Sequence, residues 1–484
     1  MFFLNLFIFA DLLKILTKNL KVTIMVEAIR KTLRDSKAAR WTALAVVSFT
    51  MLCGYYLADV MAPLKPLLES QKGWTSTEYG FFTSAYGWFN VFLVMLIIGG
   101  IILDKKGVRF TGMMATAIMV IGTAIKYWAI STHSLDGAML FGWKAQVTVA
   151  GIGYAIFGVG VEIAGITVSK IIVKWFKGKE MALAMGLEMA TARMGTALAL
   201  STSAPLATAM KDVSVPILLC LIMLCIGMIS FFIYTFMDKK LDASIVKDNI
   251  GRVVEPEEEF KLSDIKVIFM NKGWWYIAIL CVLFYSAVFP FLKYASDLMV
   301  NKFGVKESLA GLIPALLPFG TMILTPTFGN LYDRKGKGAS IMILGACLLI
   351  LVHFLFAVPF LNNWIVAILL IVVLGIGFSL VPSAMWPSVP KIIPEKQLGT
   401  AYAMIFWVQN WGLMGVPALI GWVLDKWCIT GTKVIEGNNV PTYNYTIPML
   451  IFMSLGILAL LFAFLLKAED KKKGYGLQLP NIQK

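Results

Sequence analysis

Twelve long apolar stretches follow one another along this chain of 484 residues, and they restrict its possible folds more than any other feature. A helix needs about 20 apolar residues to cross the hydrocarbon core of a bilayer, which is about 30 Å thick. Strands of membrane barrels have only about 10 residues and alternate apolar with polar side chains, so they do not fit these stretches. The sequence therefore predicts an all-α membrane protein with twelve transmembrane helices, at residues 41–64, 79–103, 110–131, 145–171, 181–210, 214–237, 274–300, 307–331, 339–360, 363–389, 397–424 and 446–467.

The composition agrees with a chain that lies mostly in lipid. Apolar residues make up 59% of the chain, charged residues make up 15%, and the mean hydropathy is +0.79. These values are too apolar for an ordinary soluble protein. We therefore expect the lipid bilayer to surround most of the chain.

The formal net charge is +15, but the basic residues do not form the single patch that is typical of nucleic-acid binding. They gather on alternate loops, so the positive-inside rule places both termini and these loops in the cytoplasm. The residues concerned are Arg30, Lys31, Arg34, Lys37, Arg40, Lys105, Lys106, Arg109, Lys174, Lys177, Lys179, Lys239, Lys240, Lys247, Arg334, Lys335, Lys337, Lys471, Lys472 and Lys473.

The sequence shows no catalytic pattern. Five of its six cysteines lie inside predicted spans, which excludes a disulfide framework and a metal-binding spacing. It contains neither a Walker loop nor a Ser/His/Asp arrangement. We therefore predict neither an enzyme nor an ATP-driven pump, and no cofactor or metal.

Two loop signatures occur twice in the same order, which indicates that a unit of six helices was duplicated. GGIILDKKGVR (99–109) returns as FGNLYDRKGKG (328–338), and KWFKGKEMALAMG (174–186) corresponds to IIPEKQLGTAYAM (392–404). Two pseudo-repeated halves are the plan of the major facilitator fold. The predicted division is a cytoplasmic N-terminal segment (1–40), a first half (41–237), a polar cytoplasmic linker (238–273), a second half (274–467) and a cytoplasmic tail (468–484).

Residues 1–24 are rich in Phe and Leu but are interrupted by lysines, so they are too short and too polar to span a bilayer. No signal-peptide cleavage pattern is present. We expect this segment either to form an interfacial helix or to lie upstream of the true start codon, in which case Met25 is the first residue of the protein.

The first repeated loop and its copy predict a gate and not a substrate contact. Their glycines let two helices approach, and their acidic and basic side chains can cap helix ends and pair across the interface between the halves. The residues assigned to gating are Asp104, Lys105, Gly107, Arg109, Asp333 and Arg334.

Glu162 and Arg193 lie deep inside predicted spans, at equal sequence distances from the turn between them. A hairpin of two helices then places both about 15 Å inside the bilayer, where a charge is costly and becomes a functional candidate. A carboxylate and a guanidinium at one depth complement a zwitterion, because Glu162 can receive an ammonium and Arg193 can bind a carboxylate with two hydrogen bonds. Alternatively, the two side chains neutralise one another, or pair only while the site is empty.

Other polar residues within the spans are given weaker roles. We expect Glu188 to have a structural partner. Asp59 and Lys293 are expected to be solvated or paired near the outer mouth, and His353 to be a core side chain.

Several aromatic and amide residues are predicted to line the cavity, with packing as their alternative role. The Phe289-Pro290-Phe291 segment predicts a break in its helix that serves as a gate or kink. Besides Phe289, the candidate lining residues are Tyr55, Tyr56, Trp88, Asn90, Trp386, Gln409 and Asn410.

The run VKWFKGKEMALAMGLEMATARMGTAL resembles the corresponding segment of the lysosomal dipeptide transporter family of major facilitators and its prokaryotic relatives. YGWFNVFL, VFPFL and MWPSVPKIIPEKQLGTAYAMIFWVQNWGL are also similar, so the resemblance covers most of the chain. It implies that Glu162 and Arg193 hold the amino and carboxyl termini of a dipeptide. It also implies alternating access by uniport, with broad tolerance of side chains.

Three residues depart from the family pattern. Glu188 stands where the family has an uncharged Gln, Tyr56 stands where another aromatic is usual, and Lys293 adds a charge to its helix. The extra acid leaves open proton coupling or a preference for more cationic peptides.

Three other functions are weaker interpretations of the sequence. An organic-anion exchanger calls for cations in the interior of spans 307–331 and 397–424, which have none. Proton-coupled peptide carriers have an acidic and arginine-rich first helix, whereas this one has only Asp59. A non-transporting sensor would not need a host for a zwitterion. We therefore expect a transporter of a small-molecule solute that functions as a monomer, in a bacterial inner membrane.

Overall fold

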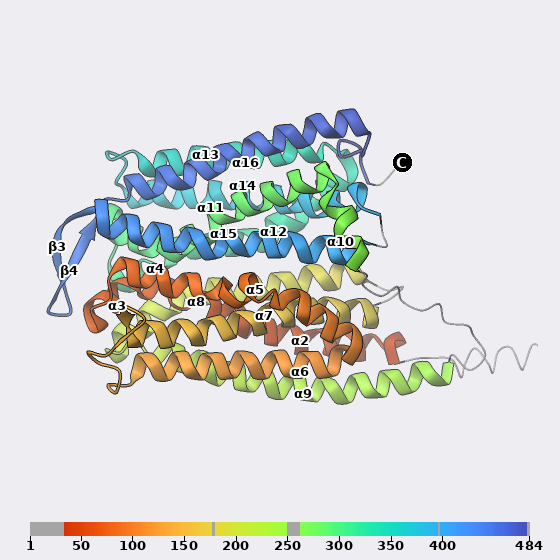
Figure 1. The fold of residues 1–484 in the computed structure, drawn as a ribbon, viewed down its shortest axis with the longest axis horizontal. Coiled ribbons are helices and arrows are strands. Elements are labelled where there is room, and N and C mark those ends of the chain that lie inside the picture. Colours follow the sequence, from red (N-terminus) through yellow and green to blue (C-terminus); the bar gives the residue numbers. More distant parts are fainter. Residues whose placement is uncertain (1–32, 177–179, 249–261, 395–396, 482–484) are drawn as a thin grey trace, which may run out of the picture.

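The computed structural model describes residues 33–176, 180–248, 262–394 and 397–481, so the predictions for residues 1–24 and Met25 lie outside the described part. The architecture is all-helical, as predicted, with long helices side by side in one bundle (Figure 1). Ten helices of the described part are long and apolar enough to cross a membrane. These ten and α8 are the long helices of the bundle: α2 (Lys37–Asp59), α6 (Met95–Ser131), α7 (Ala145–Phe176), α8 (Met181–Met210), α9 (Val215–Asp248), α11 (Lys272–Phe303), α12 (Leu312–Lys335), α13 (Gly338–Ala357), α14 (Trp364–Ile392), α15 (Leu398–Trp427) and α16 (Thr446–Lys473).

The second and third predicted spans differ from two straight helices. The chain forms α4 (Ser76–Ser84), the short 3-10 helix η3 (Ala85–Gly87) and α5 (Trp88–Phe92), and then enters α6. The backbone of α6 turns at Gly107, whose φ of 75° lies in the left-handed region that glycine adopts without steric cost. The second span is therefore segmented, and the third begins within α6.

The helices form two groups. The first group, α2 to α9, packs chiefly within itself, and so does the second group, α11 to α16. The groups meet where α4 contacts α15 and where α8 contacts α12. The predicted linker contains helical structure, because α9 continues to Asp248 and α10 (Leu262–Phe269) precedes α11. Residues 249–261 lie outside the described part.

The two ends of the bundle differ. One end, called the hairpin side, carries the strands β3 (Ile429–Ile435) and β4 (Asn438–Tyr443), which pair antiparallel and project from the helices (Figure 1). The short strands β1 (Met139–Leu140) and β2 (Trp143–Lys144) form a second antiparallel pair. The opposite end, called the terminal side, carries the start of α2 and the end of α16.

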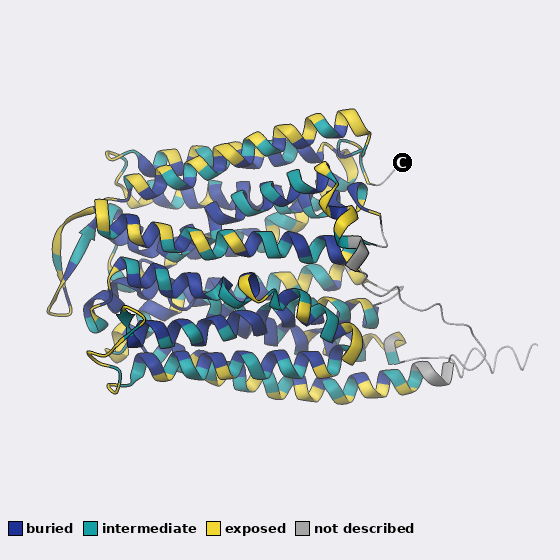
Figure 2. Ribbon diagram, in the orientation of Figure 1, coloured by how far each residue is buried: buried dark blue, intermediate teal, exposed yellow. Residues whose placement is uncertain are grey.

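Buried residues line the helix faces that meet inside the bundle, and exposed residues occupy the outward faces (Figure 2). Large apolar side chains are exposed on those outward faces, among them Phe232, Leu369 and Phe464. In water such a surface would be unfavourable, whereas lipid covers it at no hydrophobic cost. The surface therefore fits a protein that lies in a bilayer.

The structure tests two sequence predictions about the second group, one for Pro290 and one for His353. Pro290 does not break its helix, because α11 runs through it from Lys272 to Phe303. Proline removes only one backbone hydrogen bond, and buried neighbours such as Val288 and Phe291 hold the helix by packing. His353 is a core side chain, as predicted, with Nε2 3.0 Å from the carbonyl oxygen of Ala287.

Candidate functional site

Glu162 lies near the middle of α7 and is half-buried. The hydroxyl of Tyr86 donates a hydrogen bond of 2.8 Å to its Oε1 atom. A close backbone approach puts Tyr86 there, because a Cβ atom at Gly158 would lie 2.3 Å from the carbonyl oxygen of Tyr86. A glycine one turn before Glu162 on α7 thus lets η3 deliver this hydroxyl to the acid.

Arg193 lies near the middle of α8 among three aromatic rings. Its Cζ atom is 5.8 Å from the ring centroid of Tyr55, 5.2 Å from that of Phe289 and 5.5 Å from that of Phe378. Such distances allow cation–π attraction, which is strongest where water is scarce. Tyr55 belongs to the first group, and both Phe rings belong to the second, so the guanidinium lies at the interface between the groups.

The acid and the guanidinium lie at nearly the same depth, as the sequence predicts. Glu162 is about 21 Å from the terminal-side end of α7, and Arg193 is about 18 Å from that of α8, at 1.5 Å per residue. Tyr55 is within electrostatic range of both charges. In the described structure no ion pair joins Glu162 to Arg193, so they do not neutralise one another by direct contact.

Further aromatic residues continue this surface in the second group. The indole nitrogen of Trp386 donates a 3.0 Å hydrogen bond to the hydroxyl of Tyr285, whose ring also contacts Phe289 and Phe378. The sequence prediction included Phe289 and Trp386 but missed Tyr285 and Phe378. It also missed Tyr86, although spacing from Asn90 along one helix face could have suggested it.

Two aromatic residues of the prediction have other contacts. Tyr56 is buried, with its hydroxyl 2.6 Å from Oγ1 of Thr202, so it packs between α2 and α8. Trp88 donates a 3.1 Å hydrogen bond to Oγ of Ser84. Trp88 also lines an apolar surface groove with Phe89, Phe92 and Leu93. The structure does not bring either residue to the three rings around Arg193.

The three predicted amide residues lie buried near the interface between the groups. Both amide atoms of Asn90 and the Oδ1 atom of Asn410 have no hydrogen-bond partner among the described residues. The Oε1 atom of Gln409 lies 3.9 Å from Sγ of Cys281, a weak contact. These side chains therefore keep hydrogen-bonding capacity.

Glu188 does not have the structural partner that the sequence predicted. It is half-buried on α8, and no hydrogen bond or ion pair involves its carboxylate within the described part of the chain. It lies five residues before Arg193 on the same helix, about 7.5 Å along the helix axis. The region around Arg193 thus contains two acids and one cation.

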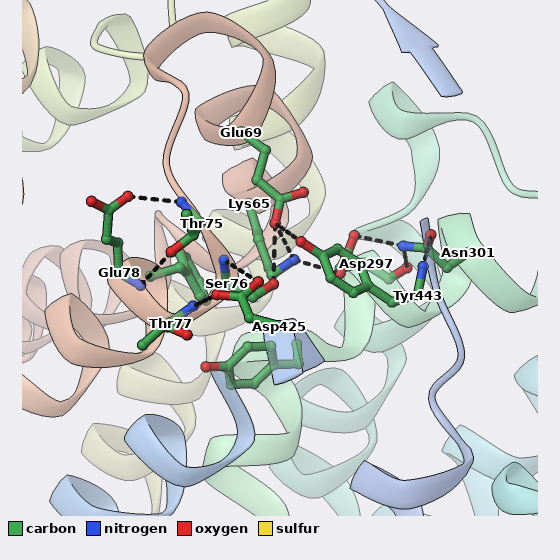
Figure 3. A network of polar contacts seen from close by, with 12 residues as sticks. Lys65, Glu69, Thr75, Ser76, Thr77, Glu78, Asp297, Asn301, Asp425 and Tyr443 are labelled. Carbon is green, nitrogen blue, oxygen red and sulfur yellow. Dashed lines mark hydrogen bonds and ion pairs between the residues drawn. The ribbon is translucent and has the colours of Figure 1, made fainter. Parts of the chain in front are cut away.

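Ion pairs close the hairpin side of the interface between the groups, and Figure 3 shows the one between Lys65 and Asp297. Nζ of Lys293 is 2.6 Å from Oδ1 of Asp59, which confirms that these two residues are paired. Nζ of the fully buried Lys65 is 2.8 Å from Oδ2 of Asp297 and 2.6 Å from Oε1 of Glu69. Asp59 and Lys65 belong to the first group, and Lys293 and Asp297 belong to the second.

Backbone donors reinforce this closure. Asp425 of α15 accepts hydrogen bonds from the backbone N–H groups of Ser76 and Thr77, at the start of α4 (Figure 3). A carboxylate at this end of a helix also interacts favourably with the helix dipole. On the hairpin itself, Ile435 accepts a 2.8 Å hydrogen bond from Oγ of Ser70. These contacts and the two ion pairs across the groups are together called the hairpin-side closure.

The predicted gating residues lie on the terminal side, and their contacts stay within one group. Nζ of Lys170 lies 2.8 Å from Oδ1 of Asp104. Arg109 pairs with Asp238 and with Asp242. The expected pairing across the interface is therefore not what the structure shows.

The second copy of the loop behaves like the first. Nδ2 of Asn481 donates a 2.7 Å hydrogen bond to Oδ1 of Asp333, within the second group. Lys105 and Arg334 are exposed, and Gly107 provides the turn in α6. Among the described residues, both ion pairs that join the groups lie on the hairpin side.

Chemically, the central site offers a carboxylate and a guanidinium that are not paired with each other, flanked by aromatic rings. Such a site can bind a molecule that carries both an ammonium and a carboxylate. No group of three metal-ligating side chains was found in the part of the chain that the structure describes.

The comparisons with known proteins point to one family. The sequence model described as Major Facilitator Superfamily matches residues 44–417, with a second match at 293–479. The human protein named lysosomal dipeptide transporter MFSD1 is 26% identical over 399 residues, which cover 80% of this chain and 81% of that protein.

Solved structures share the fold at low identity. A bacterial homolog to the human lysosomal transporter Spinster, inward-facing and unoccupied, has a TM-score of 0.64 at 11% identity and covers 93% of this chain and 99% of its own. A D-xylose-proton symporter has a TM-score of 0.63 at 15% identity, with 87% and 97% covered. These similarities show a common architecture.

Proposed function

This chain belongs to the Major Facilitator Superfamily of secondary transporters, and we propose that it moves dipeptides or similarly small zwitterionic solutes by alternating access. Glu162 would receive the ammonium of the solute, and Arg193 would bind its carboxylate. The observation that carries this proposal is the placement of the two charges at one depth without an ion pair between them. A buried charge without an opposite partner is costly, so a ligand that supplies both missing charges binds favourably.

The rings around Arg193 support a second part of the proposal. Cation–π contacts hold the guanidinium in place before the ligand arrives, which lowers the entropic cost of binding. Flat apolar surfaces also accept side chains of many shapes. The amide of Asn90 and the Oδ1 atom of Asn410, which have no hydrogen-bond partner among the described residues, are further candidates for the peptide group of the ligand. The relationship to a lysosomal dipeptide transporter agrees with this choice of solute.

We infer the conformational state from the two ends of the bundle. The basic loops predict that the terminal side faces the cytoplasm, so the hairpin-side closure would seal the site from the outside. The structure would then represent an inward-facing state. Transport requires the opposite state, in which the pairs Asp59–Lys293 and Lys65–Asp297 are parted. Uniport is the simplest cycle, because the charges of the ligand already match Glu162 and Arg193.

Thermal stabilisation of the purified protein tests the proposal. A ligand that binds only the folded state raises the apparent melting temperature, and the stabilisation grows with the logarithm of one plus the ratio of ligand concentration to Kd. The panel consists of free dipeptides, free amino acids, N-acetylated dipeptides and dipeptide amides, with small organic anions as a separate arm. Wild type and Arg193→Ala are compared.

Free dipeptides are expected to stabilise the wild type, whereas blocked dipeptides fail and Arg193→Ala responds to none. Stabilisation by organic anions alone would show that Arg193 belongs to an anion site and would reject the zwitterion proposal. Equal stabilisation by free and blocked dipeptides would reject the recognition of both termini.

A further inference from the structure

Lys126 is a fully buried lysine on α6. No described residue accepts a hydrogen bond from its Nζ atom. That atom instead lies over two aromatic rings, 4.6 Å from the centroid of Tyr154 and 5.3 Å from that of Phe82. Aromatic faces attract a cation, but they replace a carboxylate only in part. Because these contacts replace a carboxylate only in part, we expect Lys126 to have a role in another conformation.

The nearest group of charges contains one acid and a second lysine. Asp59 pairs with Lys293 and also accepts a 2.8 Å hydrogen bond from Oγ1 of Thr196. Tyr154 stands between the lysines, because its ring lies under Lys126 and its hydroxyl is 3.5 Å from Nζ of Lys293. Through Tyr154, Lys126 thus adjoins the Asp59–Lys293 pair, in which Lys293 holds the carboxylate in this state.

These residues are divided unequally between the groups. Asp59, Lys126, Tyr154 and Thr196 belong to the first group, and only Lys293 belongs to the second. Opening the hairpin side moves the groups apart, so it withdraws Lys293 from Asp59. The carboxylate would remain in its buried place on α2 without a cation, which is strongly unfavourable.

We propose that Lys126 is the alternative partner of Asp59, and that it takes the place of Lys293 when the hairpin side opens. Lys126 is then a positioning residue of the transport cycle. It does not contact the solute. The exchange keeps Asp59 paired in both states and keeps the two states close in free energy, as repeated cycling requires. This role holds for any solute, so it does not depend on the dipeptide proposal.

A double-mutant cycle between Asp59 and Lys126 tests the exchange. Spin labels at His133 and Thr432, which are exposed on the hairpin side in different groups, report the distance between the groups. The six native cysteines are replaced, and all variants carry Asp425→Asn, which weakens the hairpin-side closure away from Asp59. The compared variants carry Lys126→Met, Asp59→Asn, or both.

With Asp59 present, Lys126→Met is expected to reduce the population with the hairpin side open by about tenfold or more. With Asp59→Asn, the same substitution should change that population less than about twofold, because no carboxylate then needs a partner. Lys126→Arg should keep the distribution, because it keeps the cation. A reduction that is equal in both backgrounds, or no reduction, would overturn the proposal.

Thermal stability gives a second readout that needs no populated open state. In the closed state Lys126 has no acidic partner, so Lys126→Met should leave the melting temperature unchanged or raise it. A residue with only a structural role would lose stability on the same change. A marked fall in melting temperature for Lys126→Met would therefore also overturn the proposal.

Discussion

The hydroxyl of Tyr86 donates a 2.8 Å hydrogen bond to Oε1 of Glu162, and Arg193 makes no ion pair with that acid in the described structure. A neutral donor thus holds the carboxylate in place and leaves its charge available. In a structural ion pair the two charges would neutralise each other. In a recognition site, as here, each charge stays available to a ligand.

Replacing Tyr86 with Phe removes the donor and keeps the ring. Glu162 then loses its hydrogen bond and its fixed orientation, which should weaken binding of free dipeptides by about tenfold, or about 1.4 kcal/mol. Binding of N-acetylated dipeptides should not change. Isothermal calorimetry measures both affinities. Tyr276→Phe is the matched control, because no hydrogen bond of its hydroxyl occurs in the described structure. An equal loss in both variants would show a general effect of the substitution.

Phe289→Leu tests the rings around Arg193. The loss of a ring 5.2 Å from Cζ removes a cation–π contact of about 1 kcal/mol, so affinity for free dipeptides should fall about fivefold. Dipeptide amides, which lack the carboxylate, should lose much less. Phe354→Leu on the outward face of α13 is the control and should change nothing. Equal losses for acids and amides would mean that Phe289 acts by shape alone.

Glu188→Gln tests the second acid near Arg193. A free dipeptide with a neutral side chain can neutralise Glu162 and Arg193, and Glu188 would then be the remaining charge. We therefore expect wild type to prefer a lysine-containing dipeptide over dialanine, and Glu188→Gln to reduce that preference by about threefold to tenfold. Competition against a labelled dipeptide gives the ratio. An unchanged ratio, together with lost dependence on a proton gradient, would assign Glu188 to proton coupling instead.

Asp238→Asn tests the polar cluster on the terminal side. The carboxylate of Asp238 is fully buried. It pairs with Arg109 and Lys174 and accepts hydrogen bonds from Tyr234 and Trp175. Removing its charge should cost about 2–3 kcal/mol and lower the melting temperature by several degrees. Asp242→Asn is the control, because its side chain is 39% exposed while it binds the same two cations. Similar shifts for both variants would contradict the importance of burial here.

The positions of the helices follow from hydropathy because a chain that crosses lipid can form only helices or a closed barrel. Without water to bind free N–H and C=O groups, each apolar stretch must form a helix, so span 363–389 and α14 agree within about three residues at both ends. The segmented α4, η3 and α5 could not be predicted, because the turns there depend on packing against α7 and α15. Hydropathy is insensitive to such local departures.

The two central charges were also predictable, because charges in a membrane are rare. The same rule would have found Lys126 and Asp297, which lie inside the predicted spans 110–131 and 274–300. The ring of Phe378 could not be selected, because the chain has 32 Phe residues and their sequence positions do not show which one faces Arg193. The pairing of Asp59 with Lys293 depends on the arrangement of the groups, which the sequence does not encode locally.

The central claim is that Glu162 and Arg193 each recognise one terminus of the solute. The most direct test measures Kd for a free dipeptide, its N-acetyl form and its amide in wild type, Glu162→Gln and Arg193→Gln. Wild type should bind each blocked form at least about tenfold more weakly than the free form. Glu162→Gln should lose only the discrimination against the N-acetyl form, and Arg193→Gln only that against the amide. If both variants lose both discriminations equally, or neither loses any, the account is contradicted.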